Sequence, residues 1–165
     1  MNLKKCSTIL LPALLIAWLL STVFIDLMAV PLVFQTVSSR DEASLLGVGI
    51  FKMFNHLEIV FILSSLFFMK LSSIFSFKDF LLKISYLLFF PFFYSFYLTN
   101  KIVSLNASKM NEIDDAKLQI IQKDLDFFHQ LYVRLDSVKI FILIFSIILI
   151  INQIRKYITI NSELK

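Results

Sequence analysis

The sequence has very few of the residues on which loops, turns and cross-links depend. Its 165 residues include only two glycines, three prolines and one cysteine. So little glycine and proline argues against loop-rich, collagen-like and disordered proteins. A single cysteine, Cys6, excludes an internal disulfide framework and a thiolate metal cluster within one chain. Charged residues are also scarce, at 17% compared with about 25% in an ordinary soluble domain.

Apolar and aromatic side chains are in excess instead. Hydrophobic residues make up 58% of the chain, 19 residues are phenylalanine, and the mean hydropathy is +0.82. Soluble domains have about 45–50% apolar residues, so this chain has too little polar surface to fold in water. The composition predicts an all-α, polytopic membrane protein whose first partner is the lipid bilayer.

Four apolar segments reach the roughly 20 residues that a helix needs to cross a bilayer core. These segments are 8–34, 49–71, 80–99 and 130–153. The first is longer than the apolar region of a signal peptide, which has roughly 7–15 residues, and we interpret it as an uncleaved helix. The fourth reaches its length only by including Arg134, Asp136 and Lys139. The prediction is a single membrane domain over 1–165, an up-down bundle of four transmembrane helices.

The basic residues predict how these spans are oriented. Many of them flank the chain ends and the second connection, which lie on one side of a four-span bundle: Lys4, Lys5, Lys70, Lys78, Lys83, Arg155, Lys156 and Lys165. Because positively charged loops face the cytoplasm, we expect both termini to be cytoplasmic in a plasma or inner membrane. The pI near 9.2 reflects these flanking lysines, and no nucleic-acid partner is expected.

The third connection is predicted to be helical rather than a flexible linker. Apolar residues recur in it at helical spacing: Leu118, Ile121, Leu125 and Phe128. Asn111 is a candidate N-cap, so we expect an amphipathic helix over 111–129 that projects from the membrane and continues into the last span. Two interpretations stay open. The helix rests on the bundle or lipid surface, or it is a lid or docking arm of an assembly subunit that presents 111–128 to a partner.

Polar residues inside the apolar spans are the most informative feature. A charged residue costs about 2.5–3.5 kcal/mol at the centre of a membrane helix, so such residues face a bundle interior and find partners. With alternating spans, a polar set falls in the outer half of the membrane: Asp26, Lys52, Asn55, His56, Glu58, Asp136 and Lys139. With Arg134 included, three acids match three bases, so we expect this intramembrane polar cluster to be neutral.

The intramembrane polar cluster allows two functional interpretations. It binds or passes a small cation or a proton, or it is a salt-bridge network that fixes the register of three helices. Helical phase places several residues on one face of the last span: His129, Tyr132, Asp136 and Lys139. Convergence around a wet cavity would favour a site, whereas direct dry pairing would favour a structural role.

The histidines suggest a third possibility. His56 and His129 could be axial ligands of a haem between the second and fourth spans, or part of a metal site, although no spacing motif connects them. The sequence contains no glycine-rich phosphate loop, HExxH pair or nucleophile elbow. No enzymatic activity is therefore predicted.

Small residues and prolines add expectations about packing. Ala13, Ala17 and Ser21 form a small-xxx-small stripe on the first span, a pattern that lets helices approach closely. If Asp26 faces its own bundle, the stripe faces another helix, in a second copy of the chain or in another membrane protein. In the third span, Pro91 is expected to kink the helix.

Four short motifs resemble the pattern of a known family. They are Trp18, the stretch Met28-Ala29-Val30-Pro31-Leu32-Val33-Phe34, the entry Gly49-Ile50-Phe51-Lys52, and Phe128-x-x-Leu131-Tyr132. In these motifs the chain resembles the small four-helix membrane family of unknown function that includes transmembrane protein 205. Tyr132 stands where that family has His, Leu135 where it has Ser, and Lys139 where it has Asn. The resemblance implies a four-helix membrane fold. Through a distant similarity to copper-resistance-D-like proteins, it also implies a metal or haem.

Overall fold

The computed structural model describes residues 3–72 and 74–163, and every regular element in them is helical. The elements are α1 (Leu3–Phe24), η1 (Ile25–Ala29), α2 (Val30–Thr36), α3 (Arg40–Leu71), α4 (Phe77–Lys83), η2 (Ser85–Leu88), α5 (Phe89–Phe93), η3 (Tyr94–Leu98), α6 (Thr99–Asn111) and α7 (Asp115–Glu163). The all-α fold class predicted from the sequence is confirmed.

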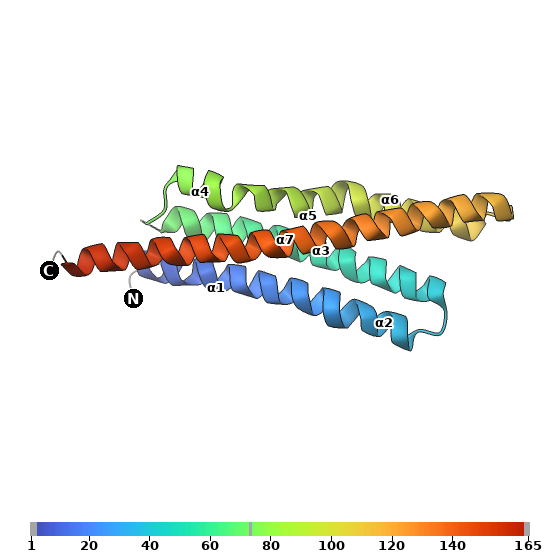
Figure 1. Ribbon diagram of the computed structural model, residues 1–165, viewed down its shortest axis with the longest axis horizontal. Coiled ribbons are helices and arrows are strands. Elements are labelled where there is room, and N and C mark those ends of the chain that lie inside the picture. The colour runs from blue at the N-terminus through green and yellow to red at the C-terminus, as the bar shows by residue number, and fades with distance from the viewer. Residues whose placement is uncertain (1–2, 73, 164–165) are drawn as a thin grey trace.

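The helices form an elongated bundle of long antiparallel rods (Figure 1). The first rod consists of α1, η1 and α2 and runs beside the second rod, α3. The third rod consists of the elements from α4 to α6 and runs beside the fourth rod, α7. The single helix α7 has 49 residues and extends along the whole bundle. The two chain ends lie together at one end of the molecule. At the other end, the hairpin of α6 and the first turns of α7 projects beyond the α2–α3 connection (Figure 1).

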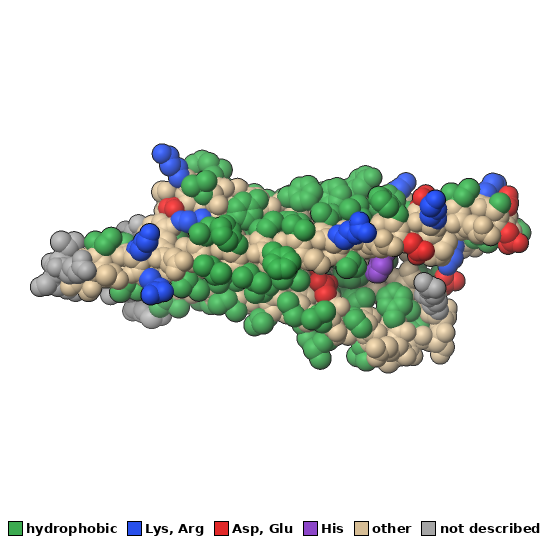
Figure 2. Space-filling model, viewed as in Figure 1, with side chains coloured by type: hydrophobic (Ala, Val, Ile, Leu, Met, Phe, Trp, Pro, Cys, Tyr) green, Lys and Arg blue, Asp and Glu red, His purple; other side chains and the backbone are tan. Residues whose placement is uncertain are grey.

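Within residues 3–72 and 74–163, three helical segments are long and apolar enough to cross a membrane: Cys6–Thr36, Asp41–Leu71 and Asp115–Ser162. A fourth crossing exists if Phe77–Lys83 and Ser85–Asn111, which are bent by 56° at their junction, count as one span. The outer surface between the polar ends is covered by apolar side chains (Figure 2). Soluble monomeric proteins rarely expose an apolar surface of this extent. These features indicate a multi-pass integral membrane protein.

The helix ends follow local capping rules. Ser39 precedes α3, and its hydroxyl accepts a hydrogen bond from the backbone N–H of Glu42. Ser76 precedes α4 and forms a capping box with Asp79, in which each side chain accepts from the other residue's backbone N–H. Such caps satisfy amide groups that have no partner inside the helix. They define where the chain turns between the long rods.

Pro31 and Pro91 lie inside helical rods and are each preceded by a turn that is not α-helical. The sharp bend in the third rod lies at Ile84 rather than at Pro91, which is buried within α5. A proline ring crowds the carbonyl four residues before it. The chain before Pro91 accordingly takes a tight 3₁₀ turn over Ser85–Leu88. Pro31 similarly follows a π-helical turn, Ile25–Ala29, and the helix continues past it to Thr36.

The third connection contains more helix than predicted. Asn111 is the last residue of α6 rather than the N-cap of the next helix, so that prediction is wrong. The side chain of Asp114 takes a capping role instead, because its Oδ1 accepts from the backbone N–H of Ala116 at 2.9 Å. From Asp115 onward, α7 runs without interruption through the region predicted as the projecting helix and the last span. The projecting arm is therefore a helical hairpin.

The interior consists of two apolar clusters that meet at Ile142. The larger cluster surrounds Trp18, Ile62 and Leu143, all fully buried between α1, α3 and α7. In the smaller cluster Phe90, Tyr94 and Leu98, from α5 and η3, pack on Tyr132 of α7. Buried polar residues lie between them, and they form the candidate site.

Candidate functional site

Lys139 is the centre of the polar residues inside the bundle. It lies on α7 and its side chain has no solvent exposure. Its Nζ donates a hydrogen bond to Oε1 of Glu58 on α3 at 2.6 Å, and the same ammonium forms an ion pair with Asp136, one helical turn earlier. Glu58 is also fully buried. A buried ammonium is tolerated only when carboxylates neutralise it in this way.

Trp18 adds a third helix to this contact. Its indole Nε1 donates to the same oxygen of Glu58 at 2.9 Å, and the indole stacks on Phe61 with ring centroids 6.1 Å apart. Helices α1, α3 and α7 are thereby joined through one carboxylate. We refer to Trp18, Glu58 and Lys139 as the anchor.

Aromatic rings enclose the ammonium of Lys139. Its Nζ lies 5.5 Å from the ring centroid of Phe54 and 5.2 Å from that of Tyr94. A cation at this distance is attracted by the negative faces of the rings. The surroundings of Lys139 thus stabilise its charged form through two carboxylates and two rings.

Asp26 brings a third carboxyl to the same place. It lies in the π-helical turn of the first rod, its side chain is partly buried, and it faces Asp136 closely enough for the two carboxyls to interact. Tyr94, in the second π-helical turn of the chain, also lies beside Asp136. Single π-helical turns occur frequently at functional sites. Here each of the two turns places a polar side chain next to Asp136, and we call Asp26 and Asp136 the carboxyl pair.

The buried charges do not balance. Three carboxyls, of Asp26, Glu58 and Asp136, surround one ammonium. The other two bases of the predicted neutral set, Lys52 and Arg134, are exposed on the outside of the bundle. The set expected to be neutral is therefore not neutral in its interior part. If every carboxyl were ionised, the interior would carry an excess of negative charge that a low-dielectric environment does not tolerate.

Buried carboxyl oxygens also lack donors. Among the described residues, Oε2 of Glu58 and Oδ2 of Asp136 accept no hydrogen bond of ordinary geometry. Buried polar atoms are nearly always paired, so an unpaired oxygen needs a proton, a water molecule or an ion. The unpaired oxygens and the excess of carboxyls indicate the same deficiency in positive charge and donors.

A second polar contact lies beside the carboxyl pair. Asn55 is fully buried on α3, and its Nδ2 donates to Oγ1 of Thr99 at 3.0 Å. The hydroxyl of Tyr132 donates to Oδ1 of Asn55 at 3.3 Å. The ring of Tyr132 stacks on Tyr94 with centroids 4.6 Å apart. This contact links α3, the third rod and α7 at the level next to the ion cluster.

On its other side, Tyr132 borders a cavity of about 160 Å³. The cavity is enclosed by α2, α3, α6 and α7, and the residues that line it include Phe34, Asp41, Ser44, Phe51, Thr99, Ile102, Asn106, Lys109, Gln122, Leu125, Asp126, His129 and Tyr132. A salt bridge of 2.7 Å between Lys109 and Asp41 lies at its outer end. The surface drawn in Figure 2 is hollowed beside a histidine near the polar end of the molecule.

The two histidines have different surroundings. His56 is exposed, and its Nδ1 lies 2.6 Å from the backbone carbonyl of Lys52 on its own helix. His129 is also exposed, and it lines the cavity. No group of three or more His, Cys, Asp or Glu side chains in the described part of the chain is arranged to hold a metal ion. A haem or metal site at His56 and His129 stays a prediction from the sequence.

The small-residue stripe lies on the outside of α1. Ala13 and Ala17 are exposed, and Ser21 is half-buried with its hydroxyl donating to the carbonyl of Ala17. The anchor residue Trp18 faces the opposite way, into the core. The stripe is therefore available to another helix, and the homo-oligomer stays a prediction.

Two contributors to the site, Trp18 and Tyr94, are not among the polar residues that the sequence singles out. A spacing signal existed for the first. Trp18, Thr22 and Asp26 recur every four residues and so share one helix face. Tyr94 carried no comparable signal, because it is one of many aromatic residues around Pro91.

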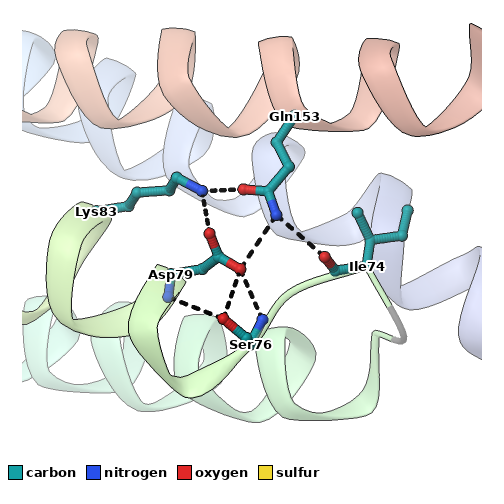
Figure 3. A network of polar contacts seen from close by, with 5 residues as sticks. All are labelled: Ile74, Ser76, Asp79, Lys83 and Gln153. Carbon is teal, nitrogen blue, oxygen red and sulfur yellow. Dashed lines mark hydrogen bonds and ion pairs between the residues drawn. The ribbon is translucent and has the colours of Figure 1, made fainter.

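A different polar network lies at the end of the bundle that holds the chain termini (Figure 3). The carboxylate of Asp79 accepts from Lys83 at 2.5 Å, from Gln153 at 3.1 Å and from the backbone and hydroxyl of Ser76. Gln153 also accepts from Lys83 and donates to the carbonyl of Ile74 at 3.0 Å. This end network ties the α3–α4 connection to α7.

No protein-family model matches the chain, and no curated protein or solved structure is significantly similar to it. The resemblance to the family that includes transmembrane protein 205 therefore stays a prediction from short motifs.

Proposed function

We propose that the protein crosses the membrane four times with both termini in the cytoplasm, and that its carboxyl pair binds and releases a proton. In this arrangement the third span begins at Ser85, after the bend, and α4 lies outside the membrane with its charged residues Lys78, Asp79 and Lys83. The observation that carries the proposal is the excess of carboxyls over ammonium groups in the interior.

The anchor and the carboxyl pair have different roles in this proposal. Glu58 and Lys139 pair directly, without exposure, and Trp18 completes their contacts. An ion pair that is closed off from solvent in this way can fix the register of α3 against α7, and it holds the ammonium of Lys139 in place. The carboxyl pair then shares that single charge with Glu58, and two adjacent carboxyls in a low-dielectric environment cannot both stay ionised. One proton on the pair removes the repulsion.

A proton fits this place better than a metal cation. A sodium or divalent ion needs several oxygen ligands around an empty position. Here the ammonium of Lys139 already contacts both Glu58 and Asp136. A second cation would be repelled by that ammonium, whereas a proton occupies no extra volume and bonds covalently to one oxygen.

Infrared difference spectroscopy of the protein in lipid vesicles tests the proposal. A protonated carboxyl has a carbonyl stretch that an ionised one lacks, so a step in pH should produce a difference band. We expect Asp136→Asn and Asp26→Asn to abolish this band while the protein still accumulates in the membrane. Asp124→Asn, which removes an exposed carboxylate from the same helix α7, is the matched control and should leave the band unchanged.

Two results would overturn the proposal. One is a band that persists in both carboxyl-pair variants, because the titrating group would then lie elsewhere. The other is a band that appears on adding sodium at constant pH, because the site would then bind a metal cation rather than a proton.

A further inference from the structure

The cavity beside Tyr132 has one end at the polar surface and the other end close to the carboxyl pair. Its outer residues, Asp41 and Lys109, come from the start of α3 and the end of α6. Its inner residues are Phe51, Thr99 and Tyr132. The cavity therefore runs inward along the projecting hairpin toward the middle of the bundle.

One layer of aromatic side chains separates the inner end from the carboxyl pair. Tyr132 stacks on Tyr94 at 4.6 Å, and Tyr94 lies beside Asp136 and 5.2 Å from the ammonium of Lys139. Phe51 supports Tyr132 from the cavity side, with ring centroids 4.4 Å apart. Displacing the ring of Tyr132 would bring the cavity into contact with the site.

The polar part of the cavity wall can hold water and attracts positive charge. Asn106 is 8% exposed and its Nδ2 has no hydrogen-bond partner among the described residues, so the amide requires water or a ligand. A volume of about 160 Å³ exceeds the roughly 30 Å³ that one water molecule occupies in the liquid. The carboxylates of Asp41 and Asp126 outnumber the one ammonium of Lys109 at the wall, and this excess attracts cations from solution.

From these contacts we infer that the cavity is the aqueous entry through which protons reach the carboxyl pair, with Tyr132 closing its inner end. The inference rests on the proposed function, because it takes the carboxyl pair to be the proton site that the entry reaches. Whether the cavity is an aqueous entry can be tested separately from that proposed function. The outer lining residues Asp41 and Lys109 place the opening of the route beside the projecting hairpin. This hairpin lies at the end of the molecule opposite to the chain termini (Figure 1). The route would connect the site to that side of the membrane.

Asn55 holds this closure rather than carrying the proton. Its carboxamide accepts from the hydroxyl of Tyr132 and donates to Thr99. A neutral amide has no titratable proton to pass on at ordinary pH. Opening thus breaks the hydrogen bond from Tyr132 to Asn55 and the stacking of Tyr132 on Tyr94. Closing restores both, which makes Tyr132 and Asn55 positioning residues.

Thiol labelling in lipid vesicles tests the aqueous entry. Cys6 is the only native cysteine, so Cys6→Ser gives a background without thiols. In that background Thr99→Cys places a thiol at the inner end of the cavity, and Phe96→Cys places one on the apolar outside of the same rod. Thr99 is 5% exposed and Phe96 is 70% exposed in the absence of lipid. A membrane-impermeant, positively charged thiosulfonate should nevertheless modify the Thr99→Cys variant and spare the Phe96→Cys variant.

The sign of the reagent gives a second readout. The cation-attracting wall predicts that a positively charged thiosulfonate reacts severalfold faster with the Thr99→Cys variant than a negatively charged one does. Asp126→Asn should reduce this ratio, and Asp124→Asn, which does not line the cavity, should not. Equal rates for both reagents, or an inert thiol at position 99, would overturn the inference.

The closing role of Tyr132 is tested by kinetics. Tyr132→Phe keeps the ring but removes the hydrogen bond to Asn55. We expect the infrared band to appear severalfold faster after a pH step, with its final amplitude unchanged. An unchanged rate would contradict the closing role.

The two proposals fail in distinguishable ways. If the band depends on Asp136 but the thiol at position 99 is inert, the proton site stands and the entry is wrong. If the thiol reacts and no band depends on the carboxyl pair, the cavity is aqueous but leads to no proton site.

Discussion

The polar network at the end of the bundle and the one around Lys139 differ in whether their charges and hydrogen bonds are matched. In the end network, one carboxylate, of Asp79, faces one ammonium, of Lys83, and Ser76 and Gln153 complete its contacts (Figure 3). Inside the bundle, three carboxyls share the ammonium of Lys139, and oxygens of Glu58 and Asp136 accept no hydrogen bond of ordinary geometry among the described residues.

This difference separates an element of structure from a candidate site. A matched network gains nothing by binding another particle. A network with more carboxylates than ammonium groups is unstable in a low-dielectric environment. It becomes stable when a proton or another positive charge binds to it. Carboxylates and lysine ammonium groups thus form a structural contact between helices at one end of α7 and a candidate proton site near the middle of the same helix.

The largest expected effect comes from removing the ammonium of Lys139, and Lys83→Met is the matched comparison in the end network. Lys139→Met leaves three carboxyls without a base, and loss of one partner from a buried ion pair costs about 3–5 kcal/mol. We expect the variant to accumulate poorly and to lose most of its thermal stability in detergent. Lys83→Met acts on a partly exposed pair and should cost about 1 kcal/mol or less.

A double substitution sharpens that result. If the cost of Lys139→Met comes from stranding Glu58, then adding Glu58→Gln should restore part of the lost stability, because replacing both members of a buried pair is far less damaging than removing one. Equal losses in the Lys139→Met and Lys83→Met variants would show that the two networks do not differ as we describe.

An intermediate effect is expected in the fluorescence of the chain's one tryptophan. Trp18 donates to Glu58, which shares Lys139 with the carboxyl pair. Protonation of that pair should change the field at the indole, so its emission should shift with pH. We expect the shift to disappear in the Asp136→Asn variant and to persist in the Asp79→Asn variant. If the pH-dependent emission shift of Trp18 persisted in both variants, protonation of the carboxyl pair would not be its cause. The anchor and the carboxyl pair would then not be electrostatically coupled.

How far the sequence predicts this arrangement depends on the kind of residue. Composition and run length predicted an all-α chain of long apolar helices, because a lipid-facing surface needs apolar residues at most positions. The same logic singled out Asp26, Glu58, Asp136 and Lys139, since ionisable residues in apolar segments avoid lipid.

Other features could not be predicted, because they depend on how the helices rotate against each other. The sequence predicts Lys52 as a member of the intramembrane polar cluster, yet Lys52 is exposed, since a residue near the end of the predicted span can direct its ammonium outward. With Lys52 and Arg134 outside, the interior part of the set carries three carboxyls and one ammonium, although the six residues together balance. The bend at Ile84 and the short α6–α7 turn were also missed, because neither contains the glycine or proline that marks such points in a sequence.

The smallest effect, and the one that isolates the matched network, is the pH dependence of Asp79→Asn. Asp79 lies on α4, outside the proposed spans. Burial acts to raise its pKa, but hydrogen bonds from Lys83 and the backbone of Ser76, together with Gln153, outweigh burial and hold the pKa well below its ordinary value. A carboxyl whose pKa is lowered on folding stabilises the protein above its unfolded pKa of about 3.9 and loses that contribution as the pH falls through the folded value.

We therefore expect the stability difference between wild type and the Asp79→Asn variant to be constant at neutral pH and clearly below the loss caused by Lys139→Met. It should shrink only below about pH 4. Thermal unfolding in detergent across this range measures it, with Asp124→Asn as an exposed control that should show little difference at any pH. A difference that instead shrinks as the pH rises would mean that Asp79 is held protonated, and the end network would then be as unmatched as the interior one.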